Sequence, residues 1–201
     1  MNLFKDNKNE YFEQDFLDVN FSGLGLAEKV FDSCAFDNCD FTEGNFERCK
    51  FISCTFTNCN LSLIKIKETS FWESSFYDSK LVGINWAEAK WSIVKLPCSL
   101  QFFNCILDHS SFFGLYLREI VIHKCSVREV DFREADLSLS DMEYSDFHEA
   151  WFIKTDLSGA NFSYALNYAI DITQNKIKKA QFMLPEAMGL LYGLEVILVE
   201  G

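Results

Sequence analysis

An apolar residue recurs at every fifth position along most of this chain. The series runs from Phe16 to Leu96 without a polar interruption, resumes one residue out of phase at Phe102 and continues to Phe162. A period of five suits neither regular element, because it spreads around a helix and alternates between the two faces of a strand. The chain must therefore turn once in every five residues, which makes an internal repeat the basis of the fold.

A coil with four such sides would point each fifth residue inward, and successive coils could stack at the strand spacing of about 4.8 Å. Equivalent inward positions would then recur every 20 residues. The residue types agree with this spacing in three columns: Phe16, Phe36, Phe56, Phe76; Phe112, Phe132, Phe152; and Leu117, Leu137, Leu157. The sequence therefore predicts an all-β, four-sided β-helix.

The boundaries of this β-helix follow from the repeat. We expect an N-terminal segment or cap over residues 1–15, the β-helix over 16–166, and a C-terminal region over 167–201. The five-residue repeat changes phase near residues 97–101. This change predicts a single extra residue between Leu96 and Phe102.

The cysteines follow the same repeat. Seven of the eight lie two positions before an inward residue, a place also occupied by Ala and Ser: Cys34, Cys39, Cys49, Cys54, Cys59, Cys105 and Cys125. Stacking would bring pairs that are 20 residues apart within reach of a disulfide, but a reducing cytosol would keep them as thiols. Zinc needs ligands that converge on one point, and His109, His123 and His148 lie at outward positions. We expect core packing, no metal and no cofactor.

The net charge of −12 argues against direct nucleic-acid binding, which depends on Lys and Arg. The first ten residues are polar, and no segment approaches the roughly 18 apolar residues of a membrane span, so we expect a cytoplasmic protein with no membrane association. No phosphate-binding loop, His-Glu-x-x-His pair or nucleophile elbow occurs, so we expect no enzyme.

Acidic residues are concentrated late in the chain. Between Glu129 and Asp171 there are ten acids and only two basic residues, Arg133 and Lys154. Five aspartates directly precede an inward residue, so the coils should spread them over successive faces: Asp131, Asp136, Asp141, Asp146 and Asp156. They are candidates for contact with a basic partner, and the alternative is a solvated surface that keeps the protein soluble.

The C-terminal region departs from the repeat. Pro185 stands where a helix begins, which predicts a short helix over about 185–193. Met188, Leu191 and Leu194 follow at helical spacing, and an apolar strand is expected over Val196, Ile197, Leu198 and Val199. These residues are candidates for a homodimer interface, and a plain cap that closes the last coil is the alternative.

The segments ADLSLSD (135–141) and TDLSGANF (155–162) resemble the Ala-(Asp/Asn)-Leu-X-X consensus of the pentapeptide-repeat family. Segments outside the consensus, such as LVGINWAEAKW (81–91) and IKKAQFMLPEA (177–187), resemble the albicidin-resistance members of its Qnr group, and the chain is more distantly similar to the microcin B17 immunity protein. Unlike plasmid-borne Qnr proteins, it shows no long loop insertion in its register.

The resemblance implies a right-handed quadrilateral β-helix with a short C-terminal helix. It also implies a homodimeric, DNA-mimicking rod that binds DNA gyrase, sometimes topoisomerase IV, and shields it from poisons such as quinolones or albicidin. Which poison is countered, and whether the enzyme is also inhibited, stay open. The alternative is a non-catalytic scaffold with a different protein partner.

Overall fold

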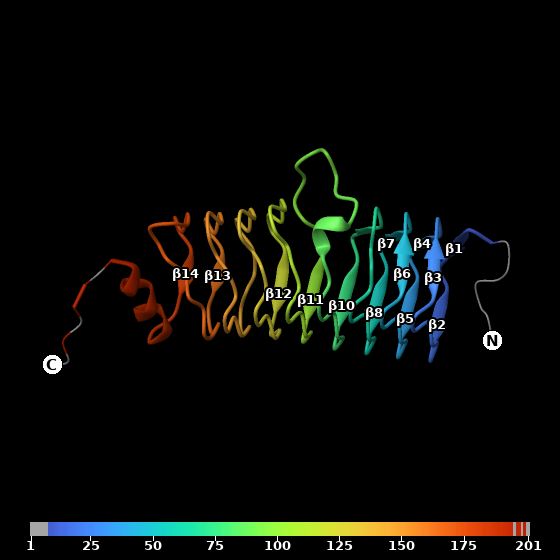
Figure 1. Cartoon of the computed structure of the whole chain (residues 1–201), viewed down its shortest axis with the longest axis horizontal. Helices are drawn as coiled ribbons and strands as arrows, with labels where there is room; N and C mark the ends of the chain where they lie inside the picture. The colour runs from blue at the N-terminus through green and yellow to red at the C-terminus, as the bar shows by residue number, and fades with distance from the viewer. Residues whose placement is uncertain (1–7, 195, 198, 200–201) are drawn as a thin grey trace.

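The computed structural model describes residues 8–194, 196–197 and 199, and Figure 1 shows a rod of stacked coils with the chain ends at opposite ends. The fold is a β-solenoid of about nine turns. Its elements are β1 (Glu10–Phe12), β2 (Asp15–Leu17), β3 (Gly25–Ala27), β4 (Val30–Asp32), β5 (Ala35–Asp37), β6 (Asn45–Glu47), β7 (Lys50–Ile52), β8 (Thr55–Thr57), β9 (Ser70–Trp72), β10 (Ser75–Tyr77), η1 (Trp86–Glu88), β11 (Gln101–Phe103), β12 (Val121–His123), β13 (Asn161–Phe162), β14 (Gln181–Phe182) and η2 (Glu186–Leu194).

The strands pair in parallel with the strands of the neighbouring coils. One side of the rod carries the order β12-β11-β10-β8-β5-β2 and another carries β1-β4-β7-β9. Phe16 lies opposite Phe36 and Phe36 lies opposite Phe56, so one coil takes 20 residues. The predicted four-sided coil is therefore confirmed.

The aromatic residues of the core form columns of stacked rings along the rod axis. Phe36 is stacked between Phe16 and Phe56 with ring centroids 4.8 and 4.7 Å apart, which is close to the strand spacing. Adjacent columns meet edge to face, as Phe36 and Phe41 do at 5.7 Å. Both geometries are favourable for aromatic pairs, so the columns add to the free energy gained by burial.

The cysteines lie inside the coils, as predicted. Cys54 is 1% exposed, and its Sγ donates to the carbonyl of Phe31 in the preceding coil at 3.4 Å. Ser74 makes the same bond to Phe51 at 3.4 Å, so a small side chain with a donor can link neighbouring coils at this position. Burial raises the pKa of the Cys54 thiol to about 12. All eight cysteines are free thiols, and seven are buried.

A loop interrupts the solenoid where the sequence predicted one extra residue. Phe76 lies opposite Phe102, 26 residues later, so six residues are inserted. The loop projects from the side of the rod after η1 (Figure 1), and Leu96 is 46% exposed. The prediction of a single-residue slip is therefore wrong. Six is one repeat plus one residue, so Leu96 falls in the apolar phase although it is not in the core.

The solenoid extends past both predicted limits. β1 pairs with β4 before residue 16, and β14 pairs with β13 after residue 166. The helix η2 follows, close to the predicted range 185–193. The expected strand is absent at Val196, Ile197 and Val199, because none of them pairs with another strand among the described residues; Leu198 lies outside the described residues. None of the described helices is long and hydrophobic enough to span a membrane.

Candidate interaction surface

The five candidate aspartates are built into the turns of the solenoid. In each, Oδ1 accepts a hydrogen bond from the backbone N–H two residues later, at 3.0 to 3.2 Å: Asp131 from Arg133, Asp136 from Ser138, Asp141 from Glu143, Asp146 from His148 and Asp156 from Ser158. Such a turn favours Asp or Asn at its first position. The five carboxylates are half-buried, and one oxygen of each serves the fold.

The turn geometry also accounts for the residues beside each aspartate. The residue three positions after each of these aspartates has a positive φ, for example Glu134 at 61° and Leu139 at 59°. The left-handed conformation closes one side of the coil and starts the next. Each of the five aspartates therefore projects from the same place on its side of the coil.

The aspartates lie on all four sides of the rod. Asp136 and Asp156 are bridged to each other across adjacent coils and share one side. The other three are bridged on the other three sides of the rod. The bridges join Asp131 to Trp151, Asp141 to Asn161 and Asp146 to Leu166. The predicted spread over successive faces is confirmed, and the five do not form one patch.

Three of these aspartates are paired with cations. Asp131 contacts Arg133 at 2.8 Å, Asp146 contacts Arg128 at 2.7 Å, and Asp156 contacts Lys176 at 3.1 Å. Among the described residues, Asp136 has no ion-pair partner. The negative electrostatic field of the acidic segment, residues 129–171, is thus weaker than its sequence suggests. Of the five aspartates, Asp136 carries the charge that is least compensated by a neighbouring cation.

The pKa values of the paired aspartates reflect competing effects. Burial acts to raise the pKa of Asp131, but hydrogen bonds from the side chain and backbone of Arg133 outweigh it, so the pKa lies below the usual value. The same balance lowers the pKa of Asp146, through Asn167 and Arg128, and that of Asp156, through Ser158 and Lys176. These carboxylates are ionised at neutral pH.

The structure reveals a feature that sequence reasoning missed, a row of rings on the outside of one face. Successive ring centroids are 5.1, 6.1, 5.4 and 4.6 Å apart in the order Tyr77, Phe103, His123, Tyr144 and Tyr164. We call these five residues the aromatic row. Tyr144 and Tyr164 are about half exposed. Aromatic residues at outward positions 20 or 21 residues apart were the available signal, but the loop insertion hid the link between Tyr77 and Phe103.

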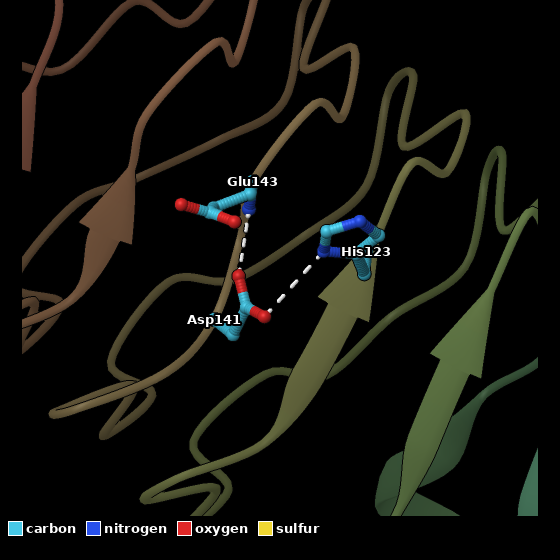
Figure 2. Close-up of side chains that lie close together, drawn as sticks. All are labelled: His123, Asp141 and Glu143. Atoms are coloured by element: carbon cyan, nitrogen blue, oxygen red, sulfur yellow. Dashed lines mark hydrogen bonds and ion pairs between the residues drawn. The ribbon is translucent and has the colours of Figure 1, made fainter.

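His123 also approaches two carboxylates from the next coil (Figure 2). One ligand-type atom of each of His123, Asp141 and Glu143 lies within 4.8 Å of the others, and His123 Nδ1 is 3.5 Å from Asp141 Oδ2. Asp141 Oδ1 accepts from the Glu143 backbone, and Glu143 Oε1 accepts from Asn161 Nδ2 at 2.7 Å. These oxygens already have structural partners, so the group by itself supports no assignment of a metal site.

The predicted dimer residues cluster at the C-terminal end of the rod. Met188 and Leu194 are each 45% exposed, Val196 is 48% and Ile197 is 91% exposed, while Leu191 is half-buried. Pro185 directly precedes η2 and is exposed. Leu190 packs against the core, so η2 is attached to the last coil and still leaves apolar side chains uncovered.

Two family models match the chain. The pentapeptide repeat region model matches residues 29–100, and the pentapeptide repeats (8 copies) model matches residues 122–159 and 140–165. No curated protein matches the sequence.

Solved structures with the same fold include two of QnrB1, a plasmid-mediated fluoroquinolone resistance protein. A trypsin-treated form has a TM-score of 0.66 at 16% identity, covering 95% of this chain and 92% of its own, and the full-length form has 0.63 at 15% identity, covering 93% and 100%. HetL, a pentapeptide repeat protein involved in heterocyst differentiation regulation from the cyanobacterium Nostoc sp. strain PCC 7120, has 0.51 at 13% identity, with 87% of each chain covered. At these identities the likeness shows the fold alone. Together with the 20-residue coil and the two matching repeat models, it places this chain in the family of pentapeptide-repeat proteins.

Proposed function

We propose that this chain is a homodimeric, acidic rod that binds a type II topoisomerase, DNA gyrase in the first place, and shields it from poisons such as albicidin or quinolones. The observation that carries the proposal is the similarity in fold to QnrB1 over nearly the whole of both chains. Because fold does not fix function, the charge distribution must also suit a DNA-binding surface, and the C-terminal end of the rod must suit a dimer interface.

The charge distribution supports approach to a basic DNA-binding surface. The acidic segment presents carboxylates on every side of the rod, as duplex DNA presents phosphates around its axis. Such a field accelerates association with a basic partner and weakens as the salt concentration rises. The ion pairs of Asp131, Asp146 and Asp156 reduce the field, so Asp136 is the first residue to test.

The exposed apolar side chains at the C-terminal end support a dimer. Ile197 and Val199 are about 90% exposed, and Met188 and Leu194 are close to half exposed. A second copy that meets this end would bury them and form a longer rod with two-fold symmetry. A rod of that kind suits an enzyme that is itself a two-fold assembly.

The aromatic row favours a second candidate function, a scaffold that binds another protein partner. A continuous row of partly exposed aromatic side chains is typical of protein interfaces rather than of a charge mimic. The similarity to HetL, which is named for a regulatory role, is consistent with a partner other than a topoisomerase.

The decisive experiment measures gyrase supercoiling and drug-induced cleavage with albicidin and with a quinolone, with and without the full-length protein. Our proposal expects fewer cleaved complexes and retained supercoiling with at least one poison. Unchanged cleavage with both, together with no association between the protein and gyrase in sedimentation, would reject the topoisomerase proposal and favour the scaffold.

A further inference from the structure

The inserted loop and the side of the rod form a partly open cavity. The cavity has a volume of about 90 Å³, and it lies between the solenoid and residues 90–100. Its aromatic lining consists of Phe71, Trp72, Trp86, Trp91 and Tyr116. No part of the proposed topoisomerase contact uses this space.

The loop is held over the cavity by specific contacts. Trp91 Nε1 donates to the Trp86 carbonyl at 2.8 Å, and the ammonium of Lys95 lies 5.3 Å from the ring centre of Tyr116. On the return path, Cys98 N donates to the Arg118 carbonyl at 2.6 Å. The cavity is therefore a constructed part of the fold rather than a gap beneath a loose segment.

The charge around the cavity is opposite in sign to that of the whole chain. Among the described residues that line it, Lys90 is the only charged one and none is Asp or Glu, although the chain carries a net charge of −12. A cationic ligand would find no counter-charge there, whereas an anion would find Lys90.

We propose that this cavity binds a small planar aromatic carboxylate, with the ring against the aromatic side chains of the lining and the negative charge near Lys90. A flat ring suits a lining of rings, which prefer offset-stacked or edge-to-face contacts. The volume limits the buried part of the ligand to about one six-membered ring. This site does not depend on the topoisomerase contact.

The chain carries its own reporter for the test. Three of its four tryptophans line the cavity, and Trp151 lies elsewhere. Tryptophan fluorescence is therefore titrated with benzoate, benzamide, toluene and benzylamine. We expect a saturable change that is strongest for benzoate and weakest for benzylamine, and Trp151→Phe should retain the signal.

One variant tests the proposed charge contact. Lys90→Gln should weaken benzoate about fivefold and leave benzamide unchanged. Lys80→Gln is the matched control, because Lys80 is exposed but does not line the cavity.

Thermal unfolding of each variant checks that the coils remain folded, and benzoate should raise the unfolding temperature of the unaltered chain. A linear, unsaturable quench with all four compounds would overturn the proposal. So would equal losses of benzoate affinity in Lys90→Gln and Lys80→Gln.

Discussion

The indole of Trp86 stacks on the ring of Phe112 with centroids 5.5 Å apart and planes 7° apart, although 26 positions separate the two residues. The next step along the same column, from Phe112 to Phe132, takes 20 positions and has nearly the same spacing of 5.4 Å. The core columns thus continue past the loop without a break, and all six inserted residues are accommodated outside them.

Deleting residues 92–97 should therefore restore a regular coil. Trp91 would then be followed by Cys98, and Phe102 would come five residues after Trp91. We expect β-rich circular dichroism to be unchanged and the unfolding temperature to stay the same or rise, because a shorter loop costs less entropy to close.

The deletion also separates the two proposals made above. It removes the roof of the cavity, so the benzoate signal should disappear, while the effect on gyrase should persist if the rod alone makes the contact. A deletion protein that is unfolded or aggregated would contradict the assignment of the six residues to a dispensable loop.

A truncation in a ring column should be strongly destabilising. Phe56 is fully buried and lies between Phe36 and Phe76, with centroids 4.7 and 4.8 Å away. Phe56→Ala should cost about 3–5 kcal/mol of unfolding free energy. Phe12→Ala, at a residue that is 57% exposed, is the control and should cost less than about 1 kcal/mol. Denaturant titrations of both proteins give the comparison.

The turn aspartates allow charge and structure to be separated. Asn20, Asn60 and Asn161 accept the same backbone hydrogen bond in this chain, at 3.0 to 3.1 Å. Asp136→Asn should therefore leave the stability unchanged within about 0.5 kcal/mol, whereas Asp136→Ala should cost about 1 kcal/mol because Ser138 loses its acceptor.

The asparagine variant then tests the role of the charge in gyrase binding. If long-range attraction contributes, Asp136→Asn should slow association with gyrase at low salt, and the difference from the unaltered chain should shrink as salt is added. An association rate that is identical at low salt would argue against a contribution from this carboxylate.

Acid should destabilise the rod through its paired aspartates. The pKa of Asp146 is lowered in the folded state, so its ionised form contributes stability above the unfolded value of about 3.9, and this contribution is lost as the pH falls through the lowered folded pKa. Asp131 and Asp156 act in the same direction. Unfolding temperatures measured from pH 6 to pH 2 should decline below about pH 4, and the decline should be shallower in Asp146→Asn.

The repeat allowed the coil, its 20-residue length and the buried cysteines to be predicted, because each five-residue unit makes its own turn and specifies its own inward residue. The same regularity caused the error at the loop. An insertion of one repeat plus one residue keeps Trp91 and Leu96 in phase, and only stacking contacts such as Phe76 on Phe102 reveal where the column continues.

The arrangement of the candidate site was harder to predict from the sequence. The order of the residues places the five aspartates on different sides, but their ion pairs join residues such as Arg128 and Asp146, which lie 18 positions apart on adjacent coils. The aromatic row likewise depends on which outward rings stack across coils, as Tyr144 and Tyr164 do. The prediction of a C-terminal strand was wrong because a strand forms only beside a partner edge, which the sequence of one chain does not specify.

The coil spacing has a consequence for any imitation of DNA. Coils advance by about 4.8 Å, whereas successive phosphates on one strand of a duplex advance by about 3.4 Å along the axis. Two coils and three base pairs therefore differ by roughly half an ångström, and the mismatch accumulates along the rod. A protein that normally tracks individual phosphates would meet the carboxylates of this rod increasingly out of step, so it could respond to their averaged potential but not to their individual positions.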